Sequence, residues 1–576
     1  MKRNYKRCVG FLGLATAMAA LSACSGGGGS GSGSDPQANI TTASSVPLVT
    51  KAETGADASR FLAQTTFGAT IPEIDRVMAV QLEAWIAEEF AKPQGYTHMG
   101  YWQERVTASA NPATTNTDWL YQSFWRSALL ADDPMRQRMA FALSQIFVVS
   151  LNDMNVSQHP RGVASYFDML GRNAFGNFRT LLEDVTLHPM MGLYLSHLRN
   201  RGDGTRSPDE NYAREVMQLF TIGVHQLNPD GTRVNGAGGV PQETYTNEDV
   251  TGIAKAFTGW SWAGPDTESA RFNGGGTPTN PDRNIQPMQP YAQYHAEAAK
   301  TFLGGTCPAG TMPRVSLSCA LDRLFLHPNV GPFIGKQLIQ RLVSSNPSPA
   351  YVGRVAAAFA DNGQGVRGDM KAVLRQILLD PEARNKPADS DVAYGKVREP
   401  LLRMTALMRA GNAASASGQF QIHNTDDPGT SLGQTAMRSP SVFNFWRPGY
   451  TPPNSELAAS GLVAPELQAA NESSVAGYLN AMQTAIQNGY GNGGDVKLDL
   501  TELQALAGDV DLLLARVELL LTSGGYRPET RTRIKDVVGS VVVPAVGETN
   551  IANAKRDRAR LALFLTVASP EFLSQK

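Results

Sequence analysis

Apolar residues recur at spacings of three and four along most of the chain from about residue 57. This period places apolar side chains on one face of an α-helix. In "DPMRQRMAFALSQIFVVS", for example, Met139, Leu143, Ile146 and Phe147 follow it. The same pattern predicts helices over residues 177–198, 328–345, 349–361, 369–379, 395–410, 501–522 and 555–568.

Strand-like alternation is scarce, and "SVVVPAV" at 540–546 is the best short candidate. Irregular segments rich in Gly, Pro and Asn interrupt the helical pattern at about 261–318, 411–437 and 484–496. No internal repeat is present. The sequence therefore predicts an all-α, mainly helical, single large globular domain over residues 55–576, with long irregular Gly/Pro-rich insertions and little strand.

The first 23 residues have the composition of an export signal, with the basic segment "MKRNYKR" followed by the short apolar segment "CVGFLGLATAMAAL". Leu21-Ser22-Ala23-Cys24 resembles a lipobox, in which the cysteine is lipidated and becomes the new N-terminus. The alternative is a plain signal peptide with an incidental cysteine. With Ser25 next to Cys24, we expect an outer-membrane lipoprotein that faces the periplasm or the cell surface.

A Gly/Ser-rich stretch follows Cys24, and residues 24–50 are expected to be a flexible tether. The lipid would then be the protein's only membrane contact. Removal of residues 1–23 takes four basic residues from a chain of formal charge −1, which leaves −5. A mildly acidic protein has no basic field to attract phosphate backbones, so we expect no nucleic-acid partner.

Two cysteines, Cys307 and Cys319, remain beyond the export signal and the lipidation site. In an oxidising compartment we expect them to form a disulfide. A zinc site would need two further ligands at matching spacing, and none is evident, so no metal site is assigned.

The segment "SPDENYAREVMQLFTIGV", residues 207–224, combines a helix start with clustered charge. Ser207 is predicted to cap the helix, with Pro208 in the first turn and Glu210 closing a capping box. Asn211, Arg214 and Glu215 lie on the polar arc. A charged outer face is commonly only solvated, but the helix start does not explain the pair, so Glu215 and Arg214 are candidate catalytic residues.

The segment "YTNEDVTGIAKAFTGWSW" repeats this arrangement, with Thr246 as the cap and Asp249 three residues later. Glu248 lies on the exposed side of the predicted helix, and both acids are candidate catalytic residues. Trp260 follows the helix. Its ring could stack on a sugar, although a tryptophan at a helix end more often belongs to the core.

Two further segments carry candidate binding residues. "GKVREPLLR" places Lys396, Arg398 and Glu399 at a helix start, where they could hold an anion or form an internal ion pair. "SPSVFNFWRPGYTPP" presents Asn444 and Arg447 in a loop bounded by prolines, a composition suited to a carbohydrate or peptide groove.

Several segments in order, from "RFLAQTTFGAT" and "ENYAREVMQLFTIGV" through "GDMKAVLRQILLDPEAR" to "SPSVFNFWRPGYTPP", resemble a bacterial family catalogued as domain of unknown function 1800. The resemblance extends from about residue 57 to the C-terminus. It implies an exported, mainly helical protein, often encoded beside exported proteins that resemble sulfatases and alkaline phosphatases. The family carries no assigned reaction or cofactor.

Two functions are compatible with these observations. The first is an exported enzyme acting on an extracytoplasmic polymer such as polysaccharide, with Glu215 as general acid or base. The second is a non-catalytic surface scaffold that binds a polymer or a sulfatase-like exported partner. For either function we expect the charged segments to converge, with Arg214 and Glu215 paired to one or more of Glu248, Asp249, Arg398, Glu399 and Arg447.

Overall fold

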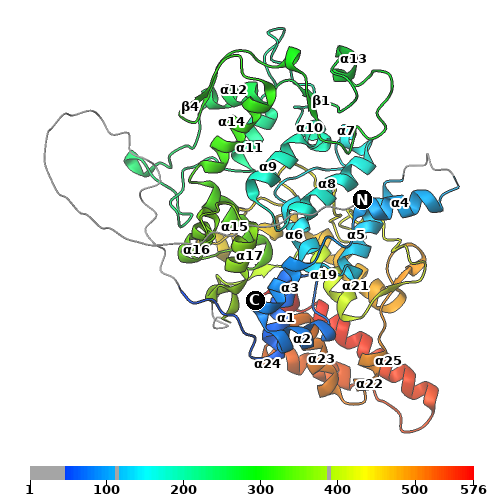
Figure 1. Ribbon diagram of the computed structural model, residues 1–576. Coiled ribbons are helices and arrows are strands. Elements are labelled where there is room, and N and C mark those ends of the chain that lie inside the picture. Colours follow the sequence, from blue (N-terminus) through cyan, green and yellow to red (C-terminus); the bar gives the residue numbers. More distant parts are fainter. Residues whose placement is uncertain (1–45, 111–115, 386–390) are drawn as a thin grey trace, which may run out of the picture. The chain divides into compact units, whose positions relative to one another are not determined.

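The computed structural model describes residues 46–110, 116–385 and 391–576. The predicted signal peptide, Cys24 and all but the last residues of the predicted tether lie outside the described residues. The described part contains 26 α-helices, which confirms the mainly helical class (Figure 1).

The N-terminal helices pack mostly against sequence neighbours, with α4 on α5 and α8, and α6 on α8. Their bounds are α1 (Gly55–Thr65), α2 (Ile71–Val80), α3 (Leu82–Ala91), α4 (His98–Ala108), α5 (Asp118–Leu130), α6 (Pro134–Ser144), α7 (Met154–Ser157), α8 (Pro160–Asn173), α9 (Phe178–Leu187) and α10 (Pro189–Tyr194). The helix predicted over 177–198 is thus two helices, because Pro189 starts a new one.

The central helices include the tightly packed series in which α16 contacts both α15 and α17. Their bounds are α11 (Asn211–Gln218), α12 (Asn247–Ala256), α13 (Ser269–Phe272), α14 (Pro313–Leu326), α15 (Val330–Leu342), α16 (Pro349–Ala360), α17 (Met370–Leu379), α18 (Pro381–Arg384) and α19 (Pro400–Ala410). Helix α19 begins at Pro400 rather than at the predicted residue 395, because Lys396 and Val397 form a strand.

The C-terminal helices surround α25, which contacts α21, α22, α23 and α24. Their bounds are α20 (Glu456–Ala459), α21 (Glu472–Asn488), α22 (Thr501–Leu506), α23 (Val510–Thr522), α24 (Pro528–Gly539), α25 (Glu548–Val567) and α26 (Pro570–Leu573). Helix α1, in blue, packs on α23, in orange, so the N-terminal helix contacts the C-terminal helices (Figure 1).

The strands of the described residues form four antiparallel pairs of two or three residues each. They are β1 (Trp260–Ser261) with β2 (Gln289–Pro290), β3 (Lys300–Phe302) with β4 (Gly305–Cys307), β5 (Lys396–Val397) with β8 (Ser574–Gln575), and β6 (Ala414–Ser415) with β7 (Val496–Lys497). Short 3₁₀ turns complete the list: η1 (Ala237–Gly239), η2 (Ala292–Tyr294), η3 (Pro465–Ala469) and η4 (Asn492–Gly494).

The strand predicted at 540–546 is wrong. That segment is irregular, and its Val542 and Val546 side chains are 78% and 79% exposed. Apolar alternation produces a strand only where a partner strand accepts its backbone hydrogen bonds, and none pairs with this segment.

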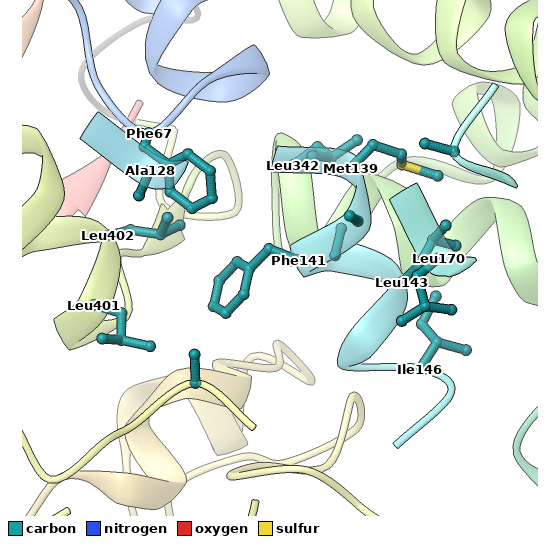
Figure 2. Close-up of a cluster of buried hydrophobic side chains, with 14 of the residues drawn as sticks. Phe67, Ala128, Met139, Phe141, Leu143, Ile146, Leu170, Leu342, Leu401 and Leu402 are labelled. Atoms are coloured by element: carbon teal, nitrogen blue, oxygen red, sulfur yellow. The ribbon is translucent and has the colours of Figure 1, made fainter. Parts of the chain in front are cut away.

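Helix α6 lies at the centre of the main hydrophobic core, and all eleven of its residues are buried. Figure 2 shows its Phe141 ring directed toward Leu401 and Leu402 of α19, with Leu143 beside Leu170 of α8. Each fully buried side chain of this size stabilises the fold by about 1.5–3 kcal/mol relative to exposure. The helix therefore joins distant parts of the chain, through these apolar contacts and through buried polar ones such as the bond from Arg138 to the Arg341 carbonyl.

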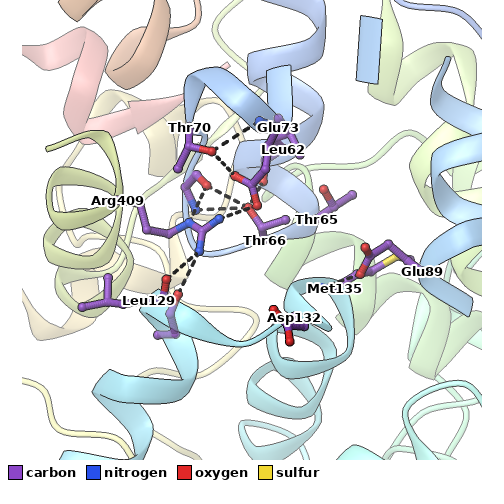
Figure 3. A network of polar contacts seen from close by, with 12 residues as sticks. Leu62, Thr65, Thr66, Thr70, Glu73, Glu89, Leu129, Asp132, Met135 and Arg409 are labelled. Carbon is purple, nitrogen blue, oxygen red and sulfur yellow. Dashed lines mark hydrogen bonds and ion pairs between the residues drawn. The ribbon is translucent and has the colours of Figure 1, made fainter. Parts of the chain in front are cut away.

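A polar network joins α19 to the turn between α1 and α2 (Figure 3). Arg409 donates from Nε to the Gly68 carbonyl at 2.8 Å and from Nη2 to Glu73. Gly68 has φ +138°, and a Cβ there would lie 2.7 Å from the Ala406 Cα. Glycine is therefore required at this position, and "RFLAQTTFGAT" acts here as a packing segment.

Cys307 and Cys319 form a disulfide, as predicted, between β4 and α14.

Within the described ranges, no helix combines the length and the apolar character that a membrane span needs.

Candidate functional site

Helix α11 begins at Asn211, later than predicted, and the capping box from Ser207 to Glu210 is wrong. The reason is tertiary: Asp209 donates its main-chain N–H to the Asn200 Oδ1 at 2.8 Å and accepts at its carbonyl from Asn200 Nδ2 at 3.0 Å. These two bonds hold the 207–210 segment against the preceding loop. Asp209 then accepts from the Asn211 N–H at 2.8 Å, which satisfies one donor at the helix start.

Arg214 and Glu215 have different environments on α11. Arg214 lies 3.7 Å from the Glu210 carboxylate, one helical turn away. Glu215 is half-buried, and its Oε2 is buried without a hydrogen-bond partner. Burial raises the pKa of the Glu215 carboxyl, and the charge of Arg214 opposes that rise by a smaller amount.

On α12, Asp249 has a structural role. Its carboxylate completes the predicted capping box with Thr246 and accepts from the Leu303 N–H at 2.6 Å, which fixes the β3–β4 hairpin on the helix. The neighbouring Glu248 is exposed. Asn211, at the start of α11, is also exposed and donates weakly to Ser196 Oγ at 3.4 Å.

Lys396 and Glu399 of the 396–399 segment and Glu466 of η3 are buried near one another, and we call these three side chains the buried charge cluster. Lys396 Nζ lies 3.0 Å from Glu466 Oε1, with both side chains at most 3% exposed. Glu399 accepts at Oε2 from the side-chain amides of Gln145 and Gln434, each at 2.6 Å.

Arg398 donates to the Leu521 carbonyl at 2.9 Å and lies over the Phe572 ring, while burial lowers its pKa to about 10. Burial also raises the pKa of Glu399. Lys396, Arg398, Glu399 and Glu466 thus all interact with groups inside the protein. Of the two alternatives left open by the sequence, the structure shows the internal ion pair.

The predicted convergence of the charged segments is wrong. Arg214 pairs with Glu210 on its own helix, and neither Arg214 nor Glu215 pairs with any of the partners predicted for them, from Glu248 to Arg447, in the described part of the chain. The physical reason is that Arg398 and Glu399 are buried away from water. Each therefore forms hydrogen bonds with the polar groups nearest to it, and not with residues of α11.

The remaining predicted binding residues also differ in their environments. Trp260 is 1% exposed in the core, with no ring face available for a sugar. Asn444 is buried and accepts from Ser439 Oγ at 3.0 Å. Arg447 is exposed, and its guanidinium lies over the Phe443 ring at 4.6 Å.

Arg447 lines a cleft of about 1030 Å³. Its walls are the end of α11, the loop from Gly223 to Pro241, α15, the start of α16 and the loop from Val442 to Gly449. The volume is at the upper end of the range for ligand sites, roughly 300–1,000 Å³. The surface is mixed, with apolar residues such as Phe333 and Val352 among polar ones.

Arg233, Lys336 and Arg447 line this cleft, which we call the cationic cleft. All three side chains are exposed, and none pairs with a carboxylate of the described residues. The acid that lines the cleft, Asp230, accepts instead from the Thr232 N–H and hydroxyl. Protein atoms around Lys336 desolvate its ammonium, which together with the charge of Arg233 lowers its pKa.

Sequence reasoning missed Arg233 and Lys336. Arg233 lies in a polar, glycine-rich loop without a recognisable ligand motif, and Lys336 lies on a mainly apolar helix that also contains Gln337, Gln340 and Arg341. One signal was present: a lysine within the "GPFIGKQLIQRL" helix has to reach solvent or a partner. Among the described residues, no three His, Cys, Asp or Glu side chains gather as metal ligands.

The structure is thus that of a mainly helical protein with an open cleft lined by three exposed cations. The family described as protein of unknown function (DUF1800) matches residues 60–574, and the chain belongs to that family. No curated protein and no solved structure matches this chain.

Proposed function

We propose that the protein is an exported, lipid-anchored binding protein that holds an anionic extracytoplasmic polymer, such as an acidic polysaccharide, in the cationic cleft. The observation that carries the proposal is the set of three exposed cations, Arg233, Lys336 and Arg447, that line one large cleft without a carboxylate partner. Cations gathered without counter-charges favour an anion from outside.

The chemistry of the walls supports a sugar polymer. Guanidinium groups bind carboxylates through paired N–H donors, and the lysine adds a point charge. Val224, Phe333 and Val442 offer apolar surface that the C–H faces of sugar rings can cover. An opening at the surface suits a chain that extends beyond the cleft.

The test compares labelled polygalacturonate with neutral dextran in binding assays on the purified full-length protein. We expect binding of the acidic polymer only, and weakening as salt is raised, because exposed charges are screened. Arg233→Gln, Lys336→Gln and Arg447→Gln should each weaken binding about tenfold, the scale of one charged hydrogen bond.

Arg533→Gln is the matched control, because Arg533 is exposed on α24 and does not line the cleft. It should bind as the unaltered protein does. Equal binding of dextran, or unchanged binding by the triple variant of the cleft, would contradict the proposal.

A second candidate function is catalysis on the same polymer, and Glu215 is the residue that favours it. A carboxylate with a raised pKa and an unpartnered oxygen is suited to general acid–base chemistry. Glu215 lies one helical turn before Gln218, which lines the cleft, but does not line the cleft itself. Depolymerisation that Glu215→Gln abolishes without loss of binding would establish this function.

A further inference from the structure

A second hollow, of about 700 Å³, lies beside the start of α11. Its lining comes from the loop between α10 and α11, residues 196–209, together with Asn273 after α13, and it shares no lining residue with the cationic cleft. Three arginines of this loop, Arg199, Arg201 and Arg206, line it. We call it the arginine hollow.

The loop that forms the arginine hollow is held in place by other segments. The Arg199 N–H donates to the Trp260 carbonyl and the Gly202 N–H to the Tyr294 carbonyl, both at 2.8 Å. Asn200 fixes the other end of the loop through its two bonds with Asp209. The loop is therefore preorganised, which reduces the entropy cost of binding a ligand.

Two residues of this loop, Ser196 and Arg199, have left-handed backbone conformations, with φ of 60° and 69°. Residues other than glycine rarely adopt this backbone conformation. Such strained residues are concentrated at ligand sites, where the surrounding structure enforces the conformation. At Arg199 the enforcing contact is the bond to Trp260.

The three guanidinium groups are oriented by contacts within the hollow. Arg201 lies over the Tyr294 ring at 4.5 Å and donates to Asn273 Oδ1 at 3.0 Å. Arg199 reaches the main-chain oxygen of the same Asn273 at 3.5 Å, and Arg206 donates to the Arg199 carbonyl at 3.2 Å. The three cations thus gather around one short stretch of chain.

Two carboxylates lie near these arginines, and they offset only part of the positive charge. Asp203 lies 3.8 Å from Arg201, near the limit of an ion pair, and its Oδ1 accepts from the Thr205 N–H and hydroxyl. Asp209 accepts from the Ser196 hydroxyl and the Asn211 N–H. Arg199 and Arg206 have no carboxylate partner among the described residues, so their charges repel each other, and a bound anion would offset that repulsion.

We propose that the arginine hollow binds a tetrahedral oxyanion, the phosphate or sulfate group of a free ion or of a monoester. Guanidinium forks match the paired oxygens of such groups. The site depends on residues other than those of the cationic cleft, so it is independent of the proposed function.

The experiment is calorimetric titration of the purified full-length protein with inorganic phosphate and inorganic sulfate, and with a sugar 6-phosphate and a sugar 6-sulfate. Sodium chloride at matched ionic strength and malonate, a dicarboxylate, are the ligand controls. We expect binding of the tetrahedral ions above both controls. Tighter binding of an ester than of the free ion would identify an esterified ligand as the source.

Arg199→Gln and Arg206→Gln should each weaken binding at least about tenfold, since each removes charged hydrogen bonds. Both side chains are exposed, so folding should be retained, as circular dichroism would show. Arg201→Lys keeps the charge but removes the planar fork, and should also weaken binding.

Arg533→Gln is the control and should bind phosphate as the unaltered protein does, because Arg533 is exposed on α24 and lines neither hollow. The proposal fails if the unaltered protein binds phosphate and sulfate no better than chloride or malonate, or if Arg199→Gln and Arg206→Gln bind unchanged. Such a failure would leave the polymer assay on the cleft unaffected, and the reverse also holds.

Discussion

The buried charge cluster and the cationic cleft both contain several charged side chains, but the two regions satisfy them in different ways. In the cluster, Lys396 and Glu466 pair at 3.0 Å and Glu399 accepts two amide donors, all in the interior. In the cleft, Lys336 is exposed and lacks a carboxylate partner among the described residues.

The difference separates a folding role from a binding role. A buried ion needs its partners to offset desolvation, so its partners come from the same chain. An exposed ion keeps part of its hydration and can exchange water for a ligand. Dense charge in a sequence is therefore compatible with either role, and the internal partners of each charge distinguish the two.

The largest expected effect tests the cluster. Lys396→Ala leaves Glu466 buried without its partner, and we expect a loss of roughly 3–5 kcal/mol in the free energy of unfolding. Chemical denaturation measures the loss. The double variant Lys396→Met/Glu466→Leu should recover most of it, because no uncompensated charge remains. A loss below about 1 kcal/mol for the single variant, within the range of ordinary substitutions, would contradict the structural role of the pair.

An intermediate, pH-dependent effect is expected at Glu215. Its pKa is raised in the folded protein, so the folded state binds this proton more tightly than the unfolded state does. The unaltered protein should therefore lose stability relative to Glu215→Gln as pH rises from about 4.3, the unfolded value, through the raised folded pKa.

At neutral pH the Glu215→Gln variant should be the more stable of the two, and near pH 3.5 the two should converge. Thermal unfolding across this range provides the measurement, with Glu248→Gln, an exposed acid, as the control. A less stable Gln variant at pH 7 would show that the Glu215 carboxylate has a stabilising partner.

The smallest expected effect on stability concerns the cationic cleft. Lys336→Ala should change the free energy of unfolding by no more than about 0.5 kcal/mol, the usual range for surface substitutions. Its lowered pKa means that the folded state disfavours the charge, so any change near pH 7 should be stabilising. A loss approaching that of Lys396→Ala, in the same denaturation assay, would place Lys336 with the cluster.

Local pattern alone determined much of this protein's secondary structure. The apolar spacing of α6, the Thr246–Asp249 capping box, the helical class and the Cys307–Cys319 pair could all be predicted, because each depends on residues close in sequence or on a single possible partner. The family resemblance could also be recognised from short segments of sequence, and the match of the family over residues 60–574 confirms it.

Only the tertiary structure decided how the charged residues are used. The bonds of Asn200 to Asp209 place the start of α11 later than predicted. The ion pair with Glu466 holds Lys396 in the interior. The cleft brings together Arg233, Lys336 and Arg447 from three separate segments. Burial and electrostatic pairing depend on which residues meet in space, and the bonded pair Gln145 and Glu399 is separated by 254 positions. Helical periodicity records which face of a helix is apolar, but it contains no information on which distant side chain will lie opposite a charge.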